Sequence, residues 1–239
     1  MNAPKTLAII QSCYIPWKGY FDLINAADEF VLYDDVQYTT NDWRNRNRIK
    51  TPQGSQWLTI PVANRLGQRI DEARIADPRW ASKHWRTLGQ NYAKATWFSR
   101  YRDRLEELYR EVEAEPLLSR VNRRFLDTIC DEFGITTPIT TSSDYGAQGE
   151  GSARVLALCH EVGAARYLSG PRGRAYLDER AFADAGVEIE YVDYTRYPEY
   201  SQVHPPFDHY VTVLDLLFNT GPESKNYLKT FASTTVARA

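Results

Sequence analysis

Apolar and polar positions predict a strand, a helix and a second strand at the start of the chain. Residues 6–11 and 30–36 are predominantly apolar, which is typical of strands buried on both faces. Residues 19–27, between them, place apolar side chains at helical spacing. A strand, a helix and a strand within roughly thirty residues indicate a βαβ unit, whose strands are parallel and whose crossover is right-handed.

The middle of the chain has another pattern, in which apolar residues recur every three or four positions. This spacing predicts three helices, at residues 80–92, 101–112 and 117–133. Gly134 directly follows the third helix and suits the left-handed position at which many helices end. We therefore expect a helical subdomain at residues 77–134.

Short apolar runs return after Gly134 and again alternate with helical spacing. The expected strands are 138–142, 165–169 and 188–191, and the expected helices are 152–162, with Ser152 as its N-cap, 178–184 and 213–218. Two further strands are expected earlier in the chain, at 57–62 and 69–75.

This order of elements predicts an α/β fold, with a mostly parallel sheet flanked by helices and a helical cap inserted in the middle of the chain. Residues 1–239 are expected to form a single domain, whose α/β core comprises residues 1–76 and 135–225. Ligands bind such sheets at the carboxyl ends of the strands. Three segments should therefore meet in one cleft: 11–17, 34–50 and 169–176.

The charge balance narrows the range of partners. The 239 residues include 29 Lys and Arg against 31 Asp and Glu, a net charge of -2. This balance argues against general nucleic-acid binding, which needs a surplus of basic residues on one face. A local basic cluster could still hold a small phosphate-bearing ligand. The sequence is compatible with an oligomer and leaves the cofactor unknown.

Cysteines and histidines give no sign of a metal site. The three cysteines are far apart, and no CxxC, HxH or HExxH spacing occurs, which fits a reduced cytosolic protein. The N-terminus does not have the pattern of a signal peptide. No segment reaches the ~18 apolar residues of a membrane span. These features predict a cytoplasmic protein without a membrane span, which would meet any lipid-linked substrate from the cytosolic side.

The loop after the first strand is the first candidate site segment. It reads QSCYIPWKGYF and leads from a buried strand into a helix, where free backbone N–H groups suit an anion. Gln11 and Tyr14 are candidate catalytic residues, and Trp17 and Lys18 are candidate ligand-binding residues. The alternative is a proline-containing turn with a packed tryptophan.

Asp34 and Asp35 end the second predicted strand and are candidate catalytic residues. Adjacent side chains of a strand point to opposite faces, so the two carboxylates are not expected to face each other as an acid/base pair. One could bind a metal, an amine or a ribose hydroxyl while the other caps the next turn. Gln37 is a candidate ligand-binding residue beside them. The alternative is a pair of solvated residues at a strand end.

Arginine and asparagine alternate strictly between Trp43 and Lys50. In an extended segment the arginines would share one face and the asparagines the other. Neighbouring guanidinium groups repel each other unless an anion is present, and their forked donors match phosphate or carboxylate. The alternative is a solvated basic loop paired with the two aspartates. The candidate ligand-binding residues are Trp43, Arg44, Asn45, Arg46, Asn47 and Arg48, and Lys50 is a candidate catalytic residue.

A glycine-containing loop after the predicted strand 165–169 is a further candidate. Its backbone amides and arginines could wrap a phosphate, although neither GxxxxGK[ST] nor GxGxxG is present. The alternative is an ordinary strand-to-helix turn. The candidate residues are Ser169, Gly170, Arg172, Gly173 and Tyr176. Asp215 and Asn219 lie four residues apart on an otherwise apolar predicted helix, where a polar pair is unusual and could face the cleft.

Together these segments resemble the WbqC-like family nearly from end to end. The family's motifs match QxxYxPWxGYF from Gln11, DDVQY from Asp34, WxNRNxIK from Trp43, YLSGxxGxxYL from Tyr167 and DLLFNxG from Asp215. The chain departs from the pattern at Ile10 and Ser12, where many members have His-Gln-Pro around the glutamine. No role of that histidine can be transferred to this chain.

The resemblance implies a bacterial protein of cell-surface polysaccharide biosynthesis, particularly O-antigen assembly. The layout also loosely resembles ligases such as pantothenate synthetase, without their HxGH signature. The hypothesis is an acyl or aminoacyl transferase acting on a nucleotide-linked amino sugar, with ATP or an acyl donor as cosubstrate. Its alternatives are a glycosyltransferase using a sugar nucleotide, although no DxD lies near a strand end, and a non-catalytic binder of glycan precursors.

Overall fold

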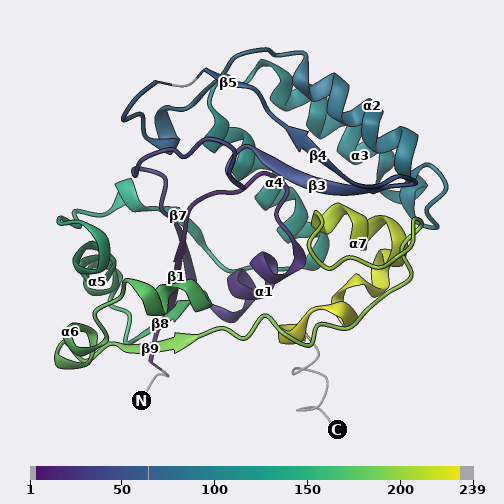
Figure 1. The fold of residues 1–239 in the computed structure, drawn as a ribbon. Helices are drawn as coiled ribbons and strands as arrows, with labels where there is room; N and C mark the ends of the chain where they lie inside the picture. The colour runs from purple at the N-terminus through teal and green to yellow at the C-terminus, as the bar shows by residue number, and fades with distance from the viewer. Residues whose placement is uncertain (1–3, 64, 232–239) are drawn as a thin grey trace, which may run out of the picture.

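The computed structural model describes residues 4–63 and 65–231, and it contains a five-stranded sheet (Figure 1). Its strands lie in the order β7-β2-β1-β8-β9, and every neighbouring pair is parallel. They are β1 (Thr6–Ile10), β2 (Glu29–Leu32), β7 (Ile139–Thr141), β8 (Arg166–Ser169) and β9 (Glu188–Tyr191). The predicted α/β fold with a mostly parallel sheet flanked by helices is confirmed.

Helices cover both faces of this sheet. The helix α1 (Lys18–Ala26) shares one hydrophobic core with Ala8 and Phe30 of the sheet. On the other face, α5 (Gly151–Val162) and α6 (Glu179–Asp184) pack in a second core with the alternate strand residues, such as Val31. Because successive strand residues point to opposite faces, β1 and β2 bury nearly every side chain, which explains their apolar sequences.

The connections leave the two central strands in opposite directions. From β1 the chain passes through α1 to β2, and from β8 it passes through α6 to β9, on the other side of β1. The strand order therefore reverses between β1 and β8. In open α/β sheets such a switch point opens a crevice at the carboxyl ends of the two strands, where ligands bind.

Four further helices lie in the other half of the molecule (Figure 1). They are α2 (Trp80–Tyr92), α3 (Phe98–Glu111), α4 (Leu118–Phe133) and α7 (Val213–Thr220). Gly134 ends α4 in the left-handed conformation, with φ of 61°, as predicted. Phe218 of α7 packs edge-on against Phe98 of α3, with 5.0 Å between the ring centroids. The end of the described chain thus returns to the helical half.

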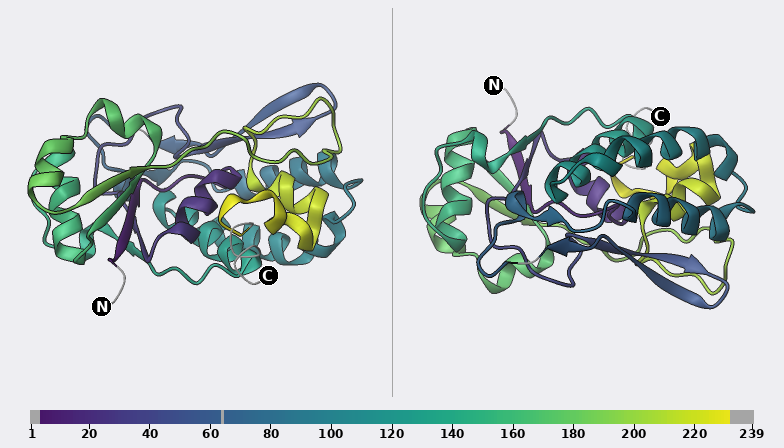
Figure 2. Two further views of the ribbon diagram at one scale, coloured as in Figure 1. Left: turned by 90° about the horizontal axis from the view of Figure 1, so that it is seen from below. Right: turned by 90° about the horizontal axis from the view of Figure 1, so that it is seen from above.

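The strands predicted at 57–62 and 69–75 do not join the main sheet. β3 (Arg46–Thr51) and β4 (Gly54–Thr59) form a separate antiparallel hairpin, and β5 (Val62–Ala63) pairs with β6 (Arg74–Ile75) in another. For β3 and β4 the reason lies in the connection, because a two-residue turn can join only antiparallel neighbours, whereas parallel strands need a long crossover. The segment between β9 and α7 runs beside the β3–β4 hairpin (Figure 2).

Two local predictions were wrong. The second strand ends at Leu32, four residues earlier than expected, so Asp34 and Asp35 lie beyond it. Ser152 lies within α5, whose N-cap is Glu150. The Ser152 hydroxyl instead accepts a hydrogen bond from the backbone N–H of Asp178 at 2.8 Å, which ties the start of α5 to the start of α6.

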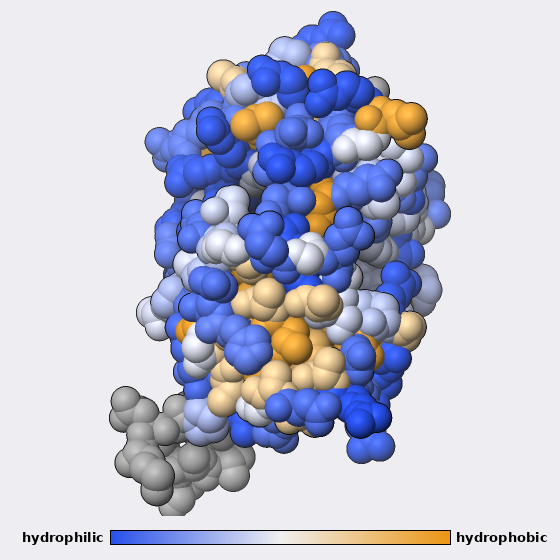
Figure 3. Space-filling model, turned by 90° about the vertical axis from the view of Figure 1, so that its left-hand side faces the viewer, coloured by the Kyte–Doolittle hydropathy of each residue, from blue (hydrophilic) through white to orange (hydrophobic). Residues whose placement is uncertain are grey.

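One side of the molecule combines a hydrophilic hollow with an apolar area. Figure 3 shows hydrophilic side chains around the hollow, and the apolar area below it, on the side of α5 and α6. Within residues 4–63 and 65–231, no helix has the length and hydropathy that a membrane span requires.

Candidate functional site

The loop after β1 is fixed by the segment that leads into β3. The backbone N–H of Tyr14 donates to the carbonyl of Trp43 at 3.1 Å. The side-chain amide of Asn47 donates to the carbonyls of Tyr14 and Ile15, at 3.2 and 2.9 Å. Ile15 has a φ of 36°, which a β-branched residue rarely adopts. The buried asparagine therefore holds a strained turn in place at the end of β1.

Tyr14 is fully buried in the helical half. Its hydroxyl lies 2.9 Å from Nδ1 of His84 and 2.7 Å from the hydroxyl of Tyr109, and its ring packs against Trp80 and Phe125. Since Nε2 of His84 lies 3.2 Å from the carbonyl of Thr59, Nε2 carries the proton and Nδ1 accepts from Tyr14. Burial lowers the pKa of His84 to about 4, so the imidazole is neutral. The structure places Tyr14 in the core, with both faces of its ring covered.

Lys50 and Asp215 belong to a second buried cluster, which we call the Asp215 network. Asp215 accepts hydrogen bonds from the hydroxyls of Tyr92 and Tyr200, both at 2.8 Å, and from the side-chain amide of Gln202 at 2.9 Å. Desolvation raises the pKa of Asp215, which these donors and the nearby charge of Lys50 oppose.

Lys50 and Asn219 complete this network. The Lys50 ammonium donates to the carbonyl of Pro206, and its backbone N–H donates to the hydroxyl of Tyr92 at 2.9 Å. Asn219 donates to the Asp215 carbonyl at 2.7 Å and accepts from the backbone N–H of Val203 at 2.9 Å. The network therefore joins β3, α2 and α7 to the segment before α7, and its donors and acceptors are largely used within the fold.

The outer face of the β3–β4 hairpin differs from the Asp215 network, because its polar groups are not paired in the same way within the fold. We call it the arginine–aromatic face: Trp43, Arg46, Arg48 and Trp57, together with Trp17 and Tyr210 beside them. The guanidinium carbon of Arg46 lies 4.1 Å from the ring centroid of Trp57, whose residue is 41% exposed. Neither Arg46 nor Arg48 uses its Nε–H in a hydrogen bond within the described residues. No carboxylate there pairs with Arg46, whereas Arg48 lies 3.8 Å from Asp208.

This face adjoins the switch point of the sheet. The Trp17 ring packs against Tyr194 at 5.2 Å and Tyr210 at 6.0 Å between centroids. Gly170, directly after β8, lies against the Tyr194 ring, where a Cβ would be 3.7 Å from it. Gly173 packs so closely on Ser169 that a Cβ would meet the hydroxyl oxygen at 2.1 Å, so a larger residue there would displace the Ser169 side chain. Trp17 of the loop after β1 and Gly170 of the loop after β8 thus both lie against the ring of Tyr194, which follows β9.

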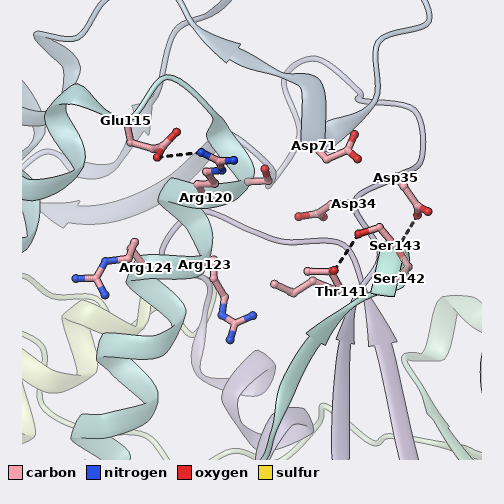
Figure 4. Close-up of a pocket in the computed structure, with 12 residues that line it drawn as sticks. Asp34, Asp35, Asp71, Glu115, Arg120, Arg123, Arg124, Thr141, Ser142 and Ser143 are labelled. Carbon is pink, nitrogen blue, oxygen red and sulfur yellow. Dashed lines mark hydrogen bonds and ion pairs between the residues drawn. The ribbon is translucent and has the colours of Figure 1, made fainter. Parts of the chain in front are cut away.

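Asp34 and Asp35 line a cavity of about 350 Å³ at the carboxyl ends of β2 and β7 (Figure 4). We call it the acid–arginine cavity. One wall holds the acids Asp34, Asp35 and Asp71 with Ser142 and Ser143, and the opposite wall holds Arg120, Arg123 and Arg124 of α4. The expectation that the two adjacent aspartates point to opposite faces was wrong. That alternation requires an extended strand, and β2 ends before them.

The two aspartates have different partners. Asp35 pairs with Arg154 and accepts a hydrogen bond from the Ser142 hydroxyl at 2.5 Å. Asp34 is 6% exposed and accepts from the backbone N–H of Ser12 at 2.7 Å, but it has no ion-pair partner among the described residues. Desolvation raises the pKa of Asp34, and the hydrogen bonds from Ser12 and the nearby charge of Arg44 oppose that rise.

Sequence analysis missed Asp71 and the arginines of α4. Asp71 lies in a short 3-10 helix (Ile70–Glu72), and the arginines occupy the polar face of an amphipathic helix. Charged residues at that spacing are common on solvated helices, so the sequence carried no signal that α4 crosses the ends of β2 and β7. No group of three or more His, Cys, Asp or Glu residues in the described parts of the chain could hold a metal ion.

The remaining predicted site residues are either hydrogen-bonded within the fold or exposed to solvent. Lys18 is buried, donates to the carbonyl of Pro198 at 2.9 Å, and has a pKa that burial lowers to about 8. Asn45 donates to the carbonyl of Ile60 at 2.8 Å. Arg44 donates to the carbonyl of Gln11 at 3.2 Å, so the prediction that it shares a face with Arg46 and Arg48 was wrong. The exposed set comprises Gln37, Arg172 and Tyr176.

Comparison with known proteins agrees with the motifs on which this geometry rests. Residues 11–227 match the sequence profile of the WbqC-like protein family. The chain belongs to the WbqC-like family. It is 47% identical over 227 residues to the uncharacterized protein Rv1507c of Mycobacterium tuberculosis, a match that covers 94% of this chain and 98% of that protein. No solved structure matches the chain significantly. For this WbqC-like protein the chemistry must therefore be argued from the residues themselves.

Proposed function

We propose that this WbqC-like protein is a transferase that binds a nucleotide-linked amino sugar on the arginine–aromatic face. The supporting observation is that Arg46 and Arg48 lie near an exposed indole, and that Asp208, 3.8 Å from Arg48, is the only carboxylate of the described residues that pairs with either. Guanidinium forks match the oxygens of a diphosphate, and indole faces stack on sugar or base rings. The face adjoins the crevice in which open α/β sheets bind ligands.

The proposed reaction is acyl or aminoacyl transfer in the biosynthesis of a surface-polysaccharide precursor. The free amine of the sugar attacks the carbonyl of an activated acyl donor, an amide bond forms, the bond to the leaving group breaks, and the amine proton leaves with that group. The donor is either an acyl thioester or a carboxylate activated by ATP. Catalysis rests on positioning the two reactants and on the positive charge near the phosphates.

The second candidate is a non-catalytic binder of the same nucleotide-linked sugar. One observation favours it: Tyr14 and Lys50, two of the residues predicted to be catalytic, are buried and engaged in the fold. Both candidates, and a glycosyltransferase, use the same face for the nucleotide. They differ in whether amide, glycoside or no product forms.

Isothermal titration calorimetry tests the shared part of the proposal. We expect UDP-glucose and a UDP-linked amino sugar to bind, and Arg46→Gln to weaken both by about ten- to a hundred-fold, because one charge-assisted contact is lost. Arg100→Gln is the matched control, because Arg100 also lies near an aromatic ring, that of Tyr101, but on α3. Absence of binding by any nucleotide-linked sugar, or an equal effect of both variants, would overturn the proposal.

Mass spectrometry then separates transferase from binder. The protein is incubated with the UDP-linked amino sugar, acetyl-CoA or an amino acid with ATP, and the mass of the sugar nucleotide is followed. An added acyl mass supports the transferase. An unchanged sugar nucleotide, despite tight binding, supports the binder.

A further inference from the structure

The acid–arginine cavity separates charges of opposite sign across a small space. Asp34, Asp35 and Asp71 lie on one side, and the α4 arginines lie on the other with Glu115 beside Arg120 (Figure 4). At about 350 Å³ it lies at the lower end of the range for small-molecule sites, so it suits a compound smaller than a nucleotide. This cavity opens beside β2 and β7, whereas the arginine–aromatic face adjoins β1 and β8.

Most charges around the cavity are already paired within the protein. Asp35 pairs with Arg154, Asp71 pairs with Arg69 at 3.0 Å, and Arg124 pairs with Glu111 at 2.6 Å. These groups shape the walls, but their charge is largely compensated. The groups that could attract a ligand are those that remain.

Asp34 is the acid that remains. It is more than nine-tenths buried and lines the cavity, and it forms no ion pair within the described residues, although Arg44 is near enough to interact with its charge. Its hydrogen bonds come from Ser12, whose backbone N–H occupies Oδ1. A buried carboxylate without an ion pair is costly, and an ammonium group that enters the cavity would add to the compensation that Arg44 gives.

Arg123, on the opposite wall, also forms an ion pair, but only through Nε, so the end of its guanidinium fork is left for a ligand. It contacts Asp127 through Nε, at 2.8 and 3.0 Å to the two carboxylate oxygens. Its two terminal nitrogens have no hydrogen-bond acceptor within residues 4–63 and 65–231. These nitrogens form the end of the guanidinium fork that binds a carboxylate in bidentate fashion.

We propose that the acid–arginine cavity binds a free amino acid as a zwitterion, with its ammonium group at Asp34 and its carboxylate at Arg123. The hydroxyl of Ser143, on the acid wall, is a further partner for the ammonium group. This binding does not require the proposed transferase function. Only one further step, the use of this amino acid as the acyl donor, rests on the proposed transferase function.

The test is calorimetric titration of the full-length protein, without nucleotide, with each L-amino acid at millimolar concentration. Propylamine and propionate, which carry only one of the two charges, serve as partial probes. We expect one or more amino acids to bind at least tenfold more tightly than either partial probe. Failure of every amino acid to bind, or equal binding by propylamine, would overturn the zwitterion assignment.

Variants locate the binding. Asp34→Asn keeps an oxygen that can accept from the Ser12 N–H, and Arg123→Gln changes a partly exposed side chain that does not depend on the Asp34 environment. Each should weaken the amino acid at least tenfold, whereas Asp77→Asn, an exposed acid paired with Arg79 and Lys83, should not. Unchanged affinity in Arg123→Gln would contradict the site even if Asp34→Asn failed to fold. If these variants lose the amino acid but still bind nucleotide-linked sugars, the result agrees with both proposals.

Discussion

The Asp215 network and the arginine–aromatic face both include polar residues of the family motifs, but they use their hydrogen-bonding groups in opposite ways. Asp215 receives donors from two tyrosines and a glutamine, and it is fully buried. Arg46 lies on a half-exposed tryptophan and makes no ion pair within the described residues. Groups that are satisfied inside the protein hold the fold together, and groups left unsatisfied at its surface are available to a ligand.

The comparison first predicts a large loss of stability when the Asp215 network is broken. Asp215→Ala leaves the hydroxyls of Tyr92 and Tyr200 without their acceptor and removes a charge near the buried Lys50. We expect the free energy of unfolding to fall by about 3–5 kcal/mol in urea titrations. Asp103→Ala, on an exposed surface of α3, is the control and should change it by less than about 0.5 kcal/mol. Similar effects of both variants would remove the basis of the comparison.

The buried cluster around Tyr14 predicts a pH dependence of stability. His84 is neutral in the fold and has a pKa of about 4, below its ordinary value of 6.5. Between these values the unfolded chain binds the proton more strongly, so stability is fully present above pH 6.5 and is lost as the pH falls toward 4. Equilibrium unfolding should show a loss on the order of 3 kcal/mol over this range.

The variant His84→Gln separates this contribution from that of other titrating groups. Its free energy of unfolding should depend less steeply on pH between 6.5 and 4 than that of the unchanged protein. Parallel pH profiles would show that His84 does not carry the effect.

The strained turn after β1 predicts a smaller effect. Asn47→Ala removes the two hydrogen bonds that hold the carbonyls of Tyr14 and Ile15, and the one that Asn47 accepts from the Arg48 N–H. Unfolding experiments should show a loss of about 2 kcal/mol. Asn91→Ala removes a hydrogen bond within α2 and should cost less than half as much. A loss below that of Asn91→Ala would mean that the turn holds its conformation without Asn47.

The sequence predicted the helices and the parallel core well, because their apolar periodicity reflects burial directly. The helix at 80–92 was placed with its observed ends. The β3–β4 hairpin was not recognised, because apolar content does not reveal whether a strand joins the main sheet. That depends on the short turn between Thr51 and Gly54.

The candidate site was harder to predict, because residue type does not reveal which polar groups the fold itself satisfies. Tyr14 and Lys50 have the chemistry of catalytic residues, and yet their partners come from α3 and from the segment before α7, far along the chain. Arg123 is the opposite case. The sequence around Arg123 is typical of an ordinary helix surface. Only the packing of α4 over β2 and β7 brings this residue to a cavity.

The central claim is that Arg46 serves a ligand and contributes little to the fold. The most direct measurement is the melting temperature of Arg46→Gln and of the unchanged protein, each with and without saturating UDP-linked amino sugar. We predict equal melting temperatures without ligand, and a ligand-induced rise that is clearly smaller in Arg46→Gln than in the unchanged protein. A lower melting temperature of Arg46→Gln without ligand, or an equal rise in both proteins, would contradict the claim.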